Sequence, residues 1–326
     1  MKREPSSGPK AKPTSLLTLA ELDQGAIDAI LSLSLKLKAA RGTSKTRPLQ
    51  GKTVALLFEK PSTRTRVSFQ VAISELGGSS ISLSSNEIQL GRGETIEDTA
   101  CVLSRYVHAI MARVNAHAEV ERLAASCTVP VINGLSDLYH PVQILADLLT
   151  LKERKGHLRG LKVAWVGDGN NVCNSWLIGA ATTGINFAAA NPPGYGPYEE
   201  AVRIAKTIAK GTGASLHLLE DPKMAVAAAD CVITDTFVSM GFDNEREERV
   251  RVFLPKYRVD KRLMALAKRD AIFEHCLPAH RGEEVTDEVI DGRNSAVWDE
   301  AENRLHTTKA LLCYLLLRHS ELQKLP

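Results

Sequence analysis

The sequence predicts an α/β fold of two doubly wound parallel-sheet domains, with an interdomain cleft and a last helix that packs back on the first domain. Apolar strand-like runs alternate with amphipathic helix-like runs along the whole chain, and the same rhythm appears in both halves. A length of 326 residues with 44% hydrophobic residues is enough for two hydrophobic cores. In such folds ligands bind at the carboxyl ends of the strands.

Each expected element of the first half follows from its hydrophobic pattern. Short apolar runs bounded by polar or turn residues predict strands at 54–58, 80–83, 109–111 and 129–132. Apolar residues at helical spacing predict helices at 19–40, 64–76, 96–106 and 118–126. A further apolar helix at 143–155 would link the two halves.

The second half repeats the alternation. Strands are expected at 163–166, 186–190, 215–219, 231–234 and 272–274. Helices are expected at 198–210 and 222–229, and an apolar last helix at 306–317. We therefore expect a disordered arm over 1–15, a first domain over 16–150 together with the C-terminal helix 306–326, and a second domain over 151–305.

Composition excludes several classes of protein. The formal net charge of +3 and the absence of a basic run argue against a nucleic-acid partner. No apolar run reaches transmembrane length, so we expect no membrane partner. Six cysteines without a CxxC pair argue against disulfides or structural zinc and favour a reducing compartment. The arm 1–13 lacks the apolar core of a signal peptide, which favours the cytoplasm, with the mitochondrial matrix as the alternative.

Ser62-Thr63-Arg64-Thr65-Arg66 is the most informative segment of the chain. It follows the strand expected at 54–58 and opens the next helix. Backbone N–H groups, three hydroxyls and two guanidiniums thus converge on one helix N-terminus, which suits a phosphate. The GxxxxGK[ST] pattern of a nucleotide P-loop is absent, so a small phosphorylated molecule is the expected ligand.

Polar side chains also follow the next strands of the first half. Arg113 comes just after the strand at 109–111, and His140 and Gln143 begin the helix that follows the fourth strand. A histidine there can donate to a carbonyl or phosphate oxygen, and Gln143 offers an amide one turn later. The loop at 87–94 is polar, and the sequence leaves open whether it is a lid or a subunit contact.

The strand ends of the second half carry a different chemistry. Gly167-Asp168-Gly169-Asn170-Asn171 lacks the third glycine and the later acidic residue of a dinucleotide site, but its asparagines could hold a carboxylate or an amine. Asp235, followed by Ser239-Met240-Gly241, could bind an amino-acid head group or simply cap the strand. The charged stretch 244–251 is expected to be mobile, and 239–251 is a candidate closing lid.

His275-Cys276-Leu277-Pro278 follows the last strand. Cys276 is a candidate nucleophile beside His275, although adjacent extended residues point apart, and a polar contact near an amine is the alternative. The Leu277-Pro278 bond is a candidate for a cis peptide. Arg304 is expected just before the last helix, where it either reaches into the cleft or pairs with Glu302.

Together these segments resemble the aspartate/ornithine carbamoyltransferase superfamily, and more closely its ornithine carbamoyltransferases. The segments 62–66 and 140–143 resemble the part shared with aspartate enzymes, which marks carbamoyl phosphate. Asp235 with 239–241, and 275–278, resemble the ornithine-type signatures. The resemblance runs in order from about residue 16 to residue 317.

The resemblance implies transfer of the carbamoyl group to the δ-amine of ornithine through a tetrahedral intermediate, giving citrulline and phosphate without metal or cofactor. The residues implied for carbamoyl phosphate are Ser62, Thr63, Arg64, Thr65, Gln89, Arg113, His140, Gln143, Cys276 and Arg304. Those implied for ornithine are Asn171, Asp235, Ser239, Met240, Cys276 and Leu277. Those implied in catalysis are Arg113, His140, Asp235, Cys276 and Arg304. Gln89 matches a loop that reaches a neighbouring subunit, which implies a homotrimer with shared sites.

Several alternative functions fit these residues less well. An aspartate enzyme needs basic groups for a second carboxylate where this chain has Asp235, and a putrescine enzyme does not need the Ser239-Met240-Gly241 turn. No feature supplies a place for the acyl group of acetylornithine. A binding protein that has lost activity is disfavoured by the intact arginines, histidine and cysteine. Arginine biosynthesis and citrulline phosphorolysis would use the same site.

Overall fold

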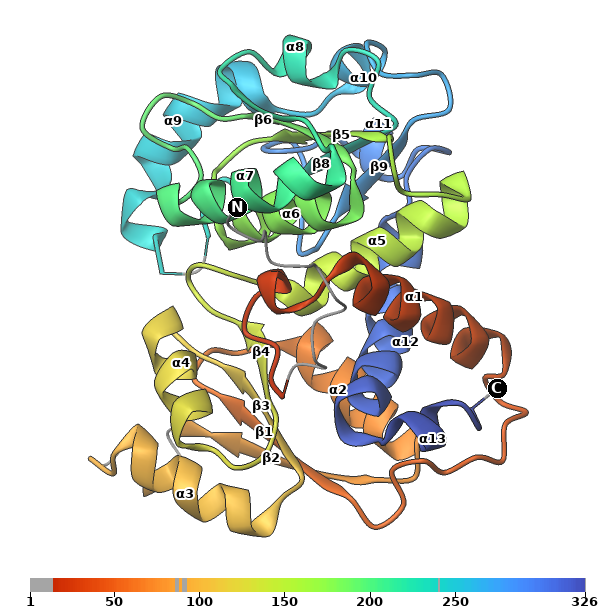
Figure 1. Ribbon diagram of the computed structural model, residues 1–326. Coiled ribbons are helices and arrows are strands. Elements are labelled where there is room, and N and C mark those ends of the chain that lie inside the picture. The colour runs from red at the N-terminus through yellow and green to blue at the C-terminus, as the bar shows by residue number, and fades with distance from the viewer. Residues whose placement is uncertain (1–13, 86–87, 90–92, 240, 326) are drawn as a thin grey trace, which may run out of the picture.

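The fold is α/β, with two parallel sheets and helices packed around each, as the sequence predicts (Figure 1). The computed structural model describes residues 14–85, 88–89, 93–239 and 241–325. A four-stranded sheet belongs to the first half of the chain and a five-stranded sheet to the second half. The helix α5 (Pro141–Lys155) leads from the first sheet to the second.

The first sheet has the strand order β2-β1-β3-β4, with every pairing parallel. Its strands are β1 (Thr53–Phe58), β2 (Ser79–Ser84), β3 (Ala109–Arg113) and β4 (Val131–Leu135). Its helices are η1 (Leu19–Glu21), α1 (Gln24–Ala39), α2 (Thr63–Glu75), α3 (Ile96–Tyr106) and α4 (His117–Ser126). The chain order changes direction between β1 and β3, so this pair forms the topological switch point.

The second sheet has the order β7-β6-β5-β8-β9, again parallel throughout. Its strands are β5 (Lys162–Val166), β6 (Asn186–Ala190), β7 (Leu216–Leu219), β8 (Cys231–Thr234) and β9 (Ile272–His275). Its helices are α6 (Asn171–Thr183), α7 (Glu199–Thr212), α8 (Pro222–Val226), η4 (Asp243–Glu245), α9 (Arg246–Tyr257), α10 (Lys261–Met264) and α11 (Asp287–Ile290). Here the switch point lies between β5 and β8.

The last long helix, α12 (Val297–Leu316), packs back on the first half of the chain against α1, α2 and α5, as expected (Figure 1). A short helix, α13 (His319–Leu322), follows it. The expected start at residue 306 is wrong, because the charged residues of its first turns obscure the apolar pattern. Asp299 and Glu300 there favour a helix N-terminus, so Arg304 lies inside the helix rather than before it.

Two further expectations are corrected. The helix expected at 19–40 is divided, because Asp23 caps a new helix by accepting a hydrogen bond from the backbone N–H of Ala26. The charged stretch 244–251, expected to be mobile, is helical. It is fixed because Arg249 and Phe253 of α9 are buried against the second sheet and its loops.

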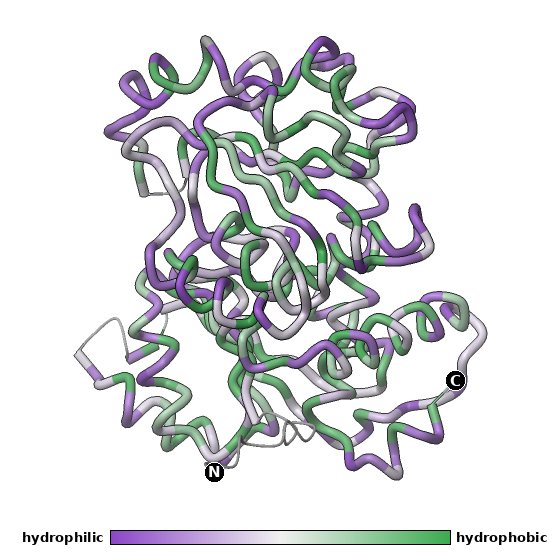
Figure 2. Tube along the Cα trace, turned by 45° about the horizontal axis from the view of Figure 1, so that its top comes forward, coloured by the Kyte–Doolittle hydropathy of each residue, from purple (hydrophilic) through white to green (hydrophobic). Residues whose placement is uncertain are grey.

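Apolar residues concentrate in the strands and on the inner faces of the helices, while polar residues concentrate in the outer helices and loops (Figure 2). Trp165, Trp176 and Phe187 are fully buried around the second sheet. Among the described residues, none of the helices combines the length and hydropathy that a membrane crossing requires. The body is therefore held by buried apolar surface, which leaves the loops at the strand ends to form a site.

Candidate active site

One cavity of about 720 Å³ collects the carboxyl-end loops of both sheets. The loops after β1 and β3 lie at the switch point of the first sheet, and those after β5 and β8 lie at the switch point of the second. This is the position where open α/β sheets bind ligands. The loops after β4 and β9 complete the wall.

Most of the residues singled out from the sequence line this cavity: Ser62, Thr63, Arg64, Thr65, Arg113, His140, Gln143, Asn171, Asp235, Ser239, Cys276, Leu277 and Arg304. Gln89 is exposed and is not among the lining residues. Met240 lies outside the described residues. The segments that the sequence separates by more than 200 positions therefore meet in one cleft.

The N-terminus of α2 opens onto the cavity. Ser62 is the N-cap, and its Oγ accepts a hydrogen bond from the backbone N–H of Thr65 at 3.3 Å. The hydroxyl hydrogen of Ser62 and the first backbone N–H groups of α2 remain available to an anion in the cavity. Arg66 instead covers the ring of Phe58, 4.7 Å from its centroid. The expected helix start is thus present, with donors of the kind that suit an anion.

Three side chains from different elements place positive charge and a neutral donor beside this helix end. Burial, together with repulsion from neighbouring guanidiniums, lowers the pKa of Arg113 and of Arg304 to about 10, so both keep their charge at neutral pH. Burial and these two cations lower the pKa of His140 well below its ordinary value. The His140 imidazole is therefore neutral and can donate one N–H to a ligand oxygen.

Arg304 reaches into the cleft rather than pairing with Glu302. Its guanidinium donates to Gln143 Oε1 and, at 3.1 Å, to Thr65 Oγ1. Glu302 contacts His306 instead, one turn further along α12. The long helix thus brings its arginine to the α2 end of the cavity because it packs against α2 and α5.

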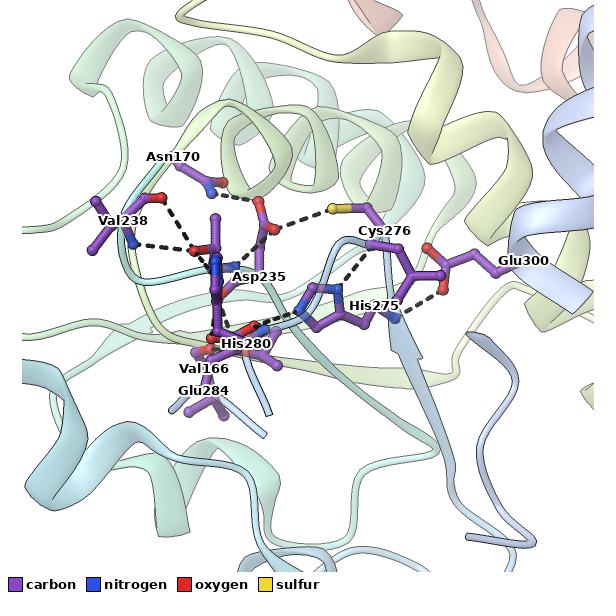
Figure 3. Close-up of polar contacts among 12 residues, drawn as sticks. Val166, Asn170, Asp235, Val238, His275, Cys276, His280, Glu284 and Glu300 are labelled. Carbon is purple, nitrogen blue, oxygen red and sulfur yellow. Dashed lines mark hydrogen bonds and ion pairs between the residues drawn. The ribbon is translucent and has the colours of Figure 1, made fainter. Parts of the chain in front are cut away.

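On the opposite wall, Asp235 is the centre of a polar cluster (Figure 3). Its carboxylate accepts hydrogen bonds from Asn170 Nδ2 at 2.7 Å, from the backbone N–H of Thr236 at 2.8 Å and from Cys276 Sγ at 3.1 Å. Asn171, which the sequence favoured, donates to the carbonyl of Ser136 at 2.7 Å. This wall therefore offers a carboxylate and polar groups that suit a cationic amine.

Cys276 is a poor nucleophile in this arrangement. Burial, and then the Asp235 carboxylate, raise the pKa of its thiol well above the ordinary value. His275 does not act on it, because its Nδ1 accepts from the backbone N–H of Leu277 at 2.9 Å and its Nε2 lies 3.2 Å from Glu284 Oε1 (Figure 3). The alternative, a polar contact near an amine, fits better. The expected cis peptide before Pro278 is confirmed.

Sequence reasoning missed a buried ion pair in the cavity wall. Arg249 Nη1 donates to Asp168 Oδ2 at 2.9 Å, and the two side chains are 8% and 11% exposed. In the sequence Asp168 is part of a glycine turn, and Arg249 is one charge among many. The one available signal is the position of Asp168 at a strand end, because its partner lies 81 positions away.

Among the described residues, three clusters near the cavity hold the side-chain types that bind metals. Ligand atoms lie within 4.8 Å of one another in Asp235, His275 and Cys276, in Asp147, Glu274 and Glu300, and in His280, Glu283 and Glu284. In the first cluster the donors and acceptors are already engaged with one another or with the backbone. We therefore interpret the first cluster as a hydrogen-bond network, whereas in the second cluster both carboxylate oxygens of Glu274 are buried without a hydrogen-bond partner.

Comparison with known proteins matches both halves of the chain. The family model for the aspartate/ornithine carbamoyltransferase carbamoyl-P binding domain matches residues 14–153, and that for the Asp/Orn binding domain matches residues 159–315. The ornithine carbamoyltransferase of Cenarchaeum symbiosum is 55% identical over 306 residues, covering 94% of this chain and 99% of that protein.

Solved structures agree over a similar span. The ornithine carbamoyltransferase of Pyrococcus furiosus matches with a TM-score of 0.89 at 51% identity, covering 93% of this chain and 96% of that chain. The anabolic ornithine carbamoyltransferase of Campylobacter jejuni matches with a TM-score of 0.88 at 43% identity, covering 93% and 99%.

Proposed function

The chain belongs to the aspartate/ornithine carbamoyltransferase family, and we infer that it is an ornithine carbamoyltransferase (EC 2.1.3.3). It transfers the carbamoyl group of carbamoyl phosphate to the δ-amine of L-ornithine, which gives L-citrulline and phosphate. The observation that carries this function is one cavity that joins the α2 N-terminus to the Asp235–Cys276 pair. The α2 end of the cavity suits an anionic substrate that donates the carbamoyl group, and the Asp235 end suits a cationic substrate that accepts it.

Residues 16–150, with residues 306–326 of the C-terminal segment that contains most of α12 and all of α13, bind carbamoyl phosphate. Ser62, Thr63, Arg64 and Thr65 hold its phosphate, because hydroxyls, a guanidinium and the helix N–H groups meet at the start of α2. The donor set, combining a helix N-terminus with side-chain cations, is that of a phosphate site rather than of a carboxylate site alone. The match of residues 14–153 to a carbamoyl-P binding domain supports this assignment.

Arg113, His140 and Arg304 act on the carbamoyl carbonyl. Two buried guanidiniums and a neutral imidazole supply donors where the carbonyl oxygen gains negative charge in the tetrahedral intermediate. In a buried cleft such donors are already oriented before the reaction, so they stabilise the transition state without reorganising. Phosphate then leaves toward the α2 N-terminus.

Residues 151–305 bind ornithine, and Asp235 and Cys276 prepare its amine. The δ-amine is mostly protonated at neutral pH and must lose a proton before it attacks. Of the other carboxylates in the cavity wall, Asp168 is paired with Arg249 and Asp137 is exposed, whereas Asp235 is buried. We therefore assign the proton to Asp235, with the Cys276 thiol, Leu277, Asn171, Ser239 and Met240 positioning the amino acid.

A product assay with ornithine, putrescine and aspartate at equal concentrations tests this function. Ornithine should be carbamoylated at a kcat/KM at least about 100-fold above either competitor, because each lacks a group that the Asp235 wall recognises. Acetylornithine serves as a fourth amine. Faster turnover of any other amine contradicts the assignment.

We also propose a homotrimer in which Gln89 completes the site of a neighbouring subunit. Gln89 is exposed and lies away from the cavity of its own chain, which supports a role across an interface. Mixed refolding of Gln89→Ala and Arg304→Ala chains should restore activity, because some shared sites then carry both intact residues. If sites are not shared, the mixture stays as inactive as its components. The archaeal and bacterial sources of the similar proteins support a cytoplasmic enzyme.

A further inference from the structure

A buried acid pair lies directly behind the cavity, outside the residues assigned above. Asp147 follows Gln143 by one turn of α5, and Glu300 precedes Arg304 by one turn of α12. Both acids are 1% exposed. Neither borders the cavity, so neither can touch a substrate. Their function must therefore act through another residue.

That residue is Gln143, whose carboxamide lies between the acids and Arg304. Gln143 Nε2 donates to Asp147 Oδ1 at 2.7 Å and to Glu300 Oε1 at 2.8 Å. Its Oε1 accepts from the guanidinium of Arg304. A guanidinium can only donate hydrogen bonds, so the carboxamide oxygen of Gln143 must face Arg304. The two N–H groups of the same carboxamide donate to Asp147 and Glu300. The orientation of the carboxamide is thus determined chemically.

Each acid also accepts a hydrogen bond through its second carboxylate oxygen, the one that does not contact Gln143. The remaining oxygen of Asp147 accepts from Trp176 Nε1 at 2.9 Å, and that of Glu300 accepts from the backbone N–H of His275 at 2.8 Å. Burial raises the pKa of Asp147 to about 7 and that of Glu300 well above its ordinary value. Glu274, the third acid of this cluster, has a raised pKa as well, and acids that retain protons at neutral pH avoid the cost of adjacent buried charges.

We propose that Asp147 and Glu300 are positioning residues that keep the Gln143 carbonyl oxygen turned toward the cavity, so that the site selects a donor phosphate whose acyl group carries an N–H. This rests on the proposed function and deepens it. Carbamoyl phosphate presents an NH₂ that donates to this oxygen, whereas acetyl phosphate presents a methyl group of similar size. A methyl group would leave the second lone pair of this buried oxygen without a donor and reduce affinity.

Replacing either acid by its amide removes this orientation without changing the shape of the pocket. In Glu300→Gln, the His275 N–H still needs an acceptor, so the new NH₂ must face Gln143. In Asp147→Asn, the Trp176 indole N–H imposes the same choice. Gln143 then either turns its own NH₂ toward the cavity or leaves a donor facing a donor. Glu302→Gln is the matched control, because Glu302 is on α12 but half-exposed and bonded to His306.

Calorimetric binding of two stable phosphonates tests the inference without turnover. Phosphonoacetamide carries the NH₂ of the carbamoyl group, and acetonylphosphonate carries a methyl group instead. The intact protein and Glu302→Gln should prefer the amide by about 10-fold, which corresponds to one net hydrogen bond. In Glu300→Gln and Asp147→Asn the preference should fall to about threefold or less. Inorganic phosphate should bind all four proteins within about twofold, since the α2 N-terminus is untouched.

The contrary results are distinct. An unchanged preference in a folded amide variant overturns the inference, as does a parallel loss of phosphate and of both phosphonates. If Glu300→Gln does not fold, Asp147→Asn decides the question by the same measurement. Failure of the intact protein to carbamoylate ornithine would instead contradict the proposed function, while the binding preference could still be measured.

Discussion

Replacing Arg249 by alanine leaves the Asp168 carboxylate buried without its counter-ion. The pair joins α9 to the loop after β5 through an Arg249 Nη1–Asp168 Oδ2 contact of 2.9 Å. Arg249 also lies over the rings of Phe242 and Tyr195, at 4.4 and 5.2 Å from their centroids. The substitution therefore removes the buried charge interaction with Asp168, a second one with the half-exposed Glu245 at 2.8 Å, a hydrogen bond to the Phe237 carbonyl and two ring contacts.

The interaction with Asp168 makes the largest contribution to the expected loss of stability. At an effective dielectric constant of about 20, charges at this separation attract by roughly 6 kcal/mol before desolvation is subtracted. Breaking a buried pair on one side costs about 3–5 kcal/mol, because the remaining charge stays buried. Loss of the ring contacts alone would cost about 1 kcal/mol. We expect a decrease of about 3–5 kcal/mol in the free energy of unfolding at pH 8.

The decrease in the free energy of unfolding caused by Arg249→Ala must depend on pH. Burial raises the pKa of Asp168 to about 6, above its unfolded value, although Arg249 opposes the shift. A raised acid pKa means that the native state binds more protons than the unfolded state, so stability falls as pH rises toward that pKa. At pH 5 the Asp168 carboxyl is mostly protonated in the native state. Removing Arg249 therefore costs little electrostatic stabilisation at that pH. The difference between the variant and the intact protein should shrink there to about 1 kcal/mol.

Urea unfolding at pH 5 and pH 8, followed by fluorescence, measures both values. Arg246→Ala is the control, because Arg246 is also on α9 but forms an exposed pair with Glu283. This substitution should cost less than about 1 kcal/mol at either pH. An equal cost for Arg249→Ala at both pH values would refute the electrostatic reasoning. It would assign the effect to lost packing on Phe242 and Tyr195.

Three further outcomes are expected. Arg64→Ala should lower kcat/KM for carbamoyl phosphate by at least about 100-fold in steady-state kinetics, and near-normal kinetics would exclude the phosphate assignment. Gly169→Ala should lower stability by about 2 kcal/mol or more in thermal unfolding, because the new Cβ would lie 2.2 Å from the Gly196 carbonyl carbon. An unchanged Tm would contradict this close approach. Iodoacetamide at pH 7 should modify the exposed Cys101 well before Cys276, whose thiol pKa is raised, and peptide mass spectrometry would detect the reverse order.

Local sequence is sufficient for the features that depend on neighbouring residues. The strands β1, β6 and β8 appear in the hydrophobic pattern, and the Ser62 cap with its arginines follows β1 within a few positions. Strand ends of parallel sheets carry function, so the loops containing His140 and Asp235 can be identified from the order of residues alone. The family, and through it the reaction, follow from these same loops.

The start of α12 and the order of α9 differ from expectation because tertiary packing overrides local polarity. Glu300, Asn303 and Arg304 would be solvated on an isolated helix, but here they are buried where α12 packs against α2 and α5, and each forms hydrogen bonds there. Arg249 likewise fixes a charged segment that the sequence suggests is mobile. Burial of a polar side chain depends on its partner, which the local sequence does not contain.

The sequence by itself therefore determined that the proposed phosphate site, a helix start rich in hydroxyls and arginines, follows a strand of one sheet. It also determined that Asp235, the proposed partner of the amine, follows a strand of the other sheet. Only the tertiary structure decided that these ends share one cavity and how their supporting groups are oriented. Glu300 and Gln143 lie 157 positions apart, and Arg249 and Asp168 lie 81 apart. Contacts at such separations are set by how the two sheets and α12 pack, because hydrogen bonds depend on distance and angle rather than on order along the chain.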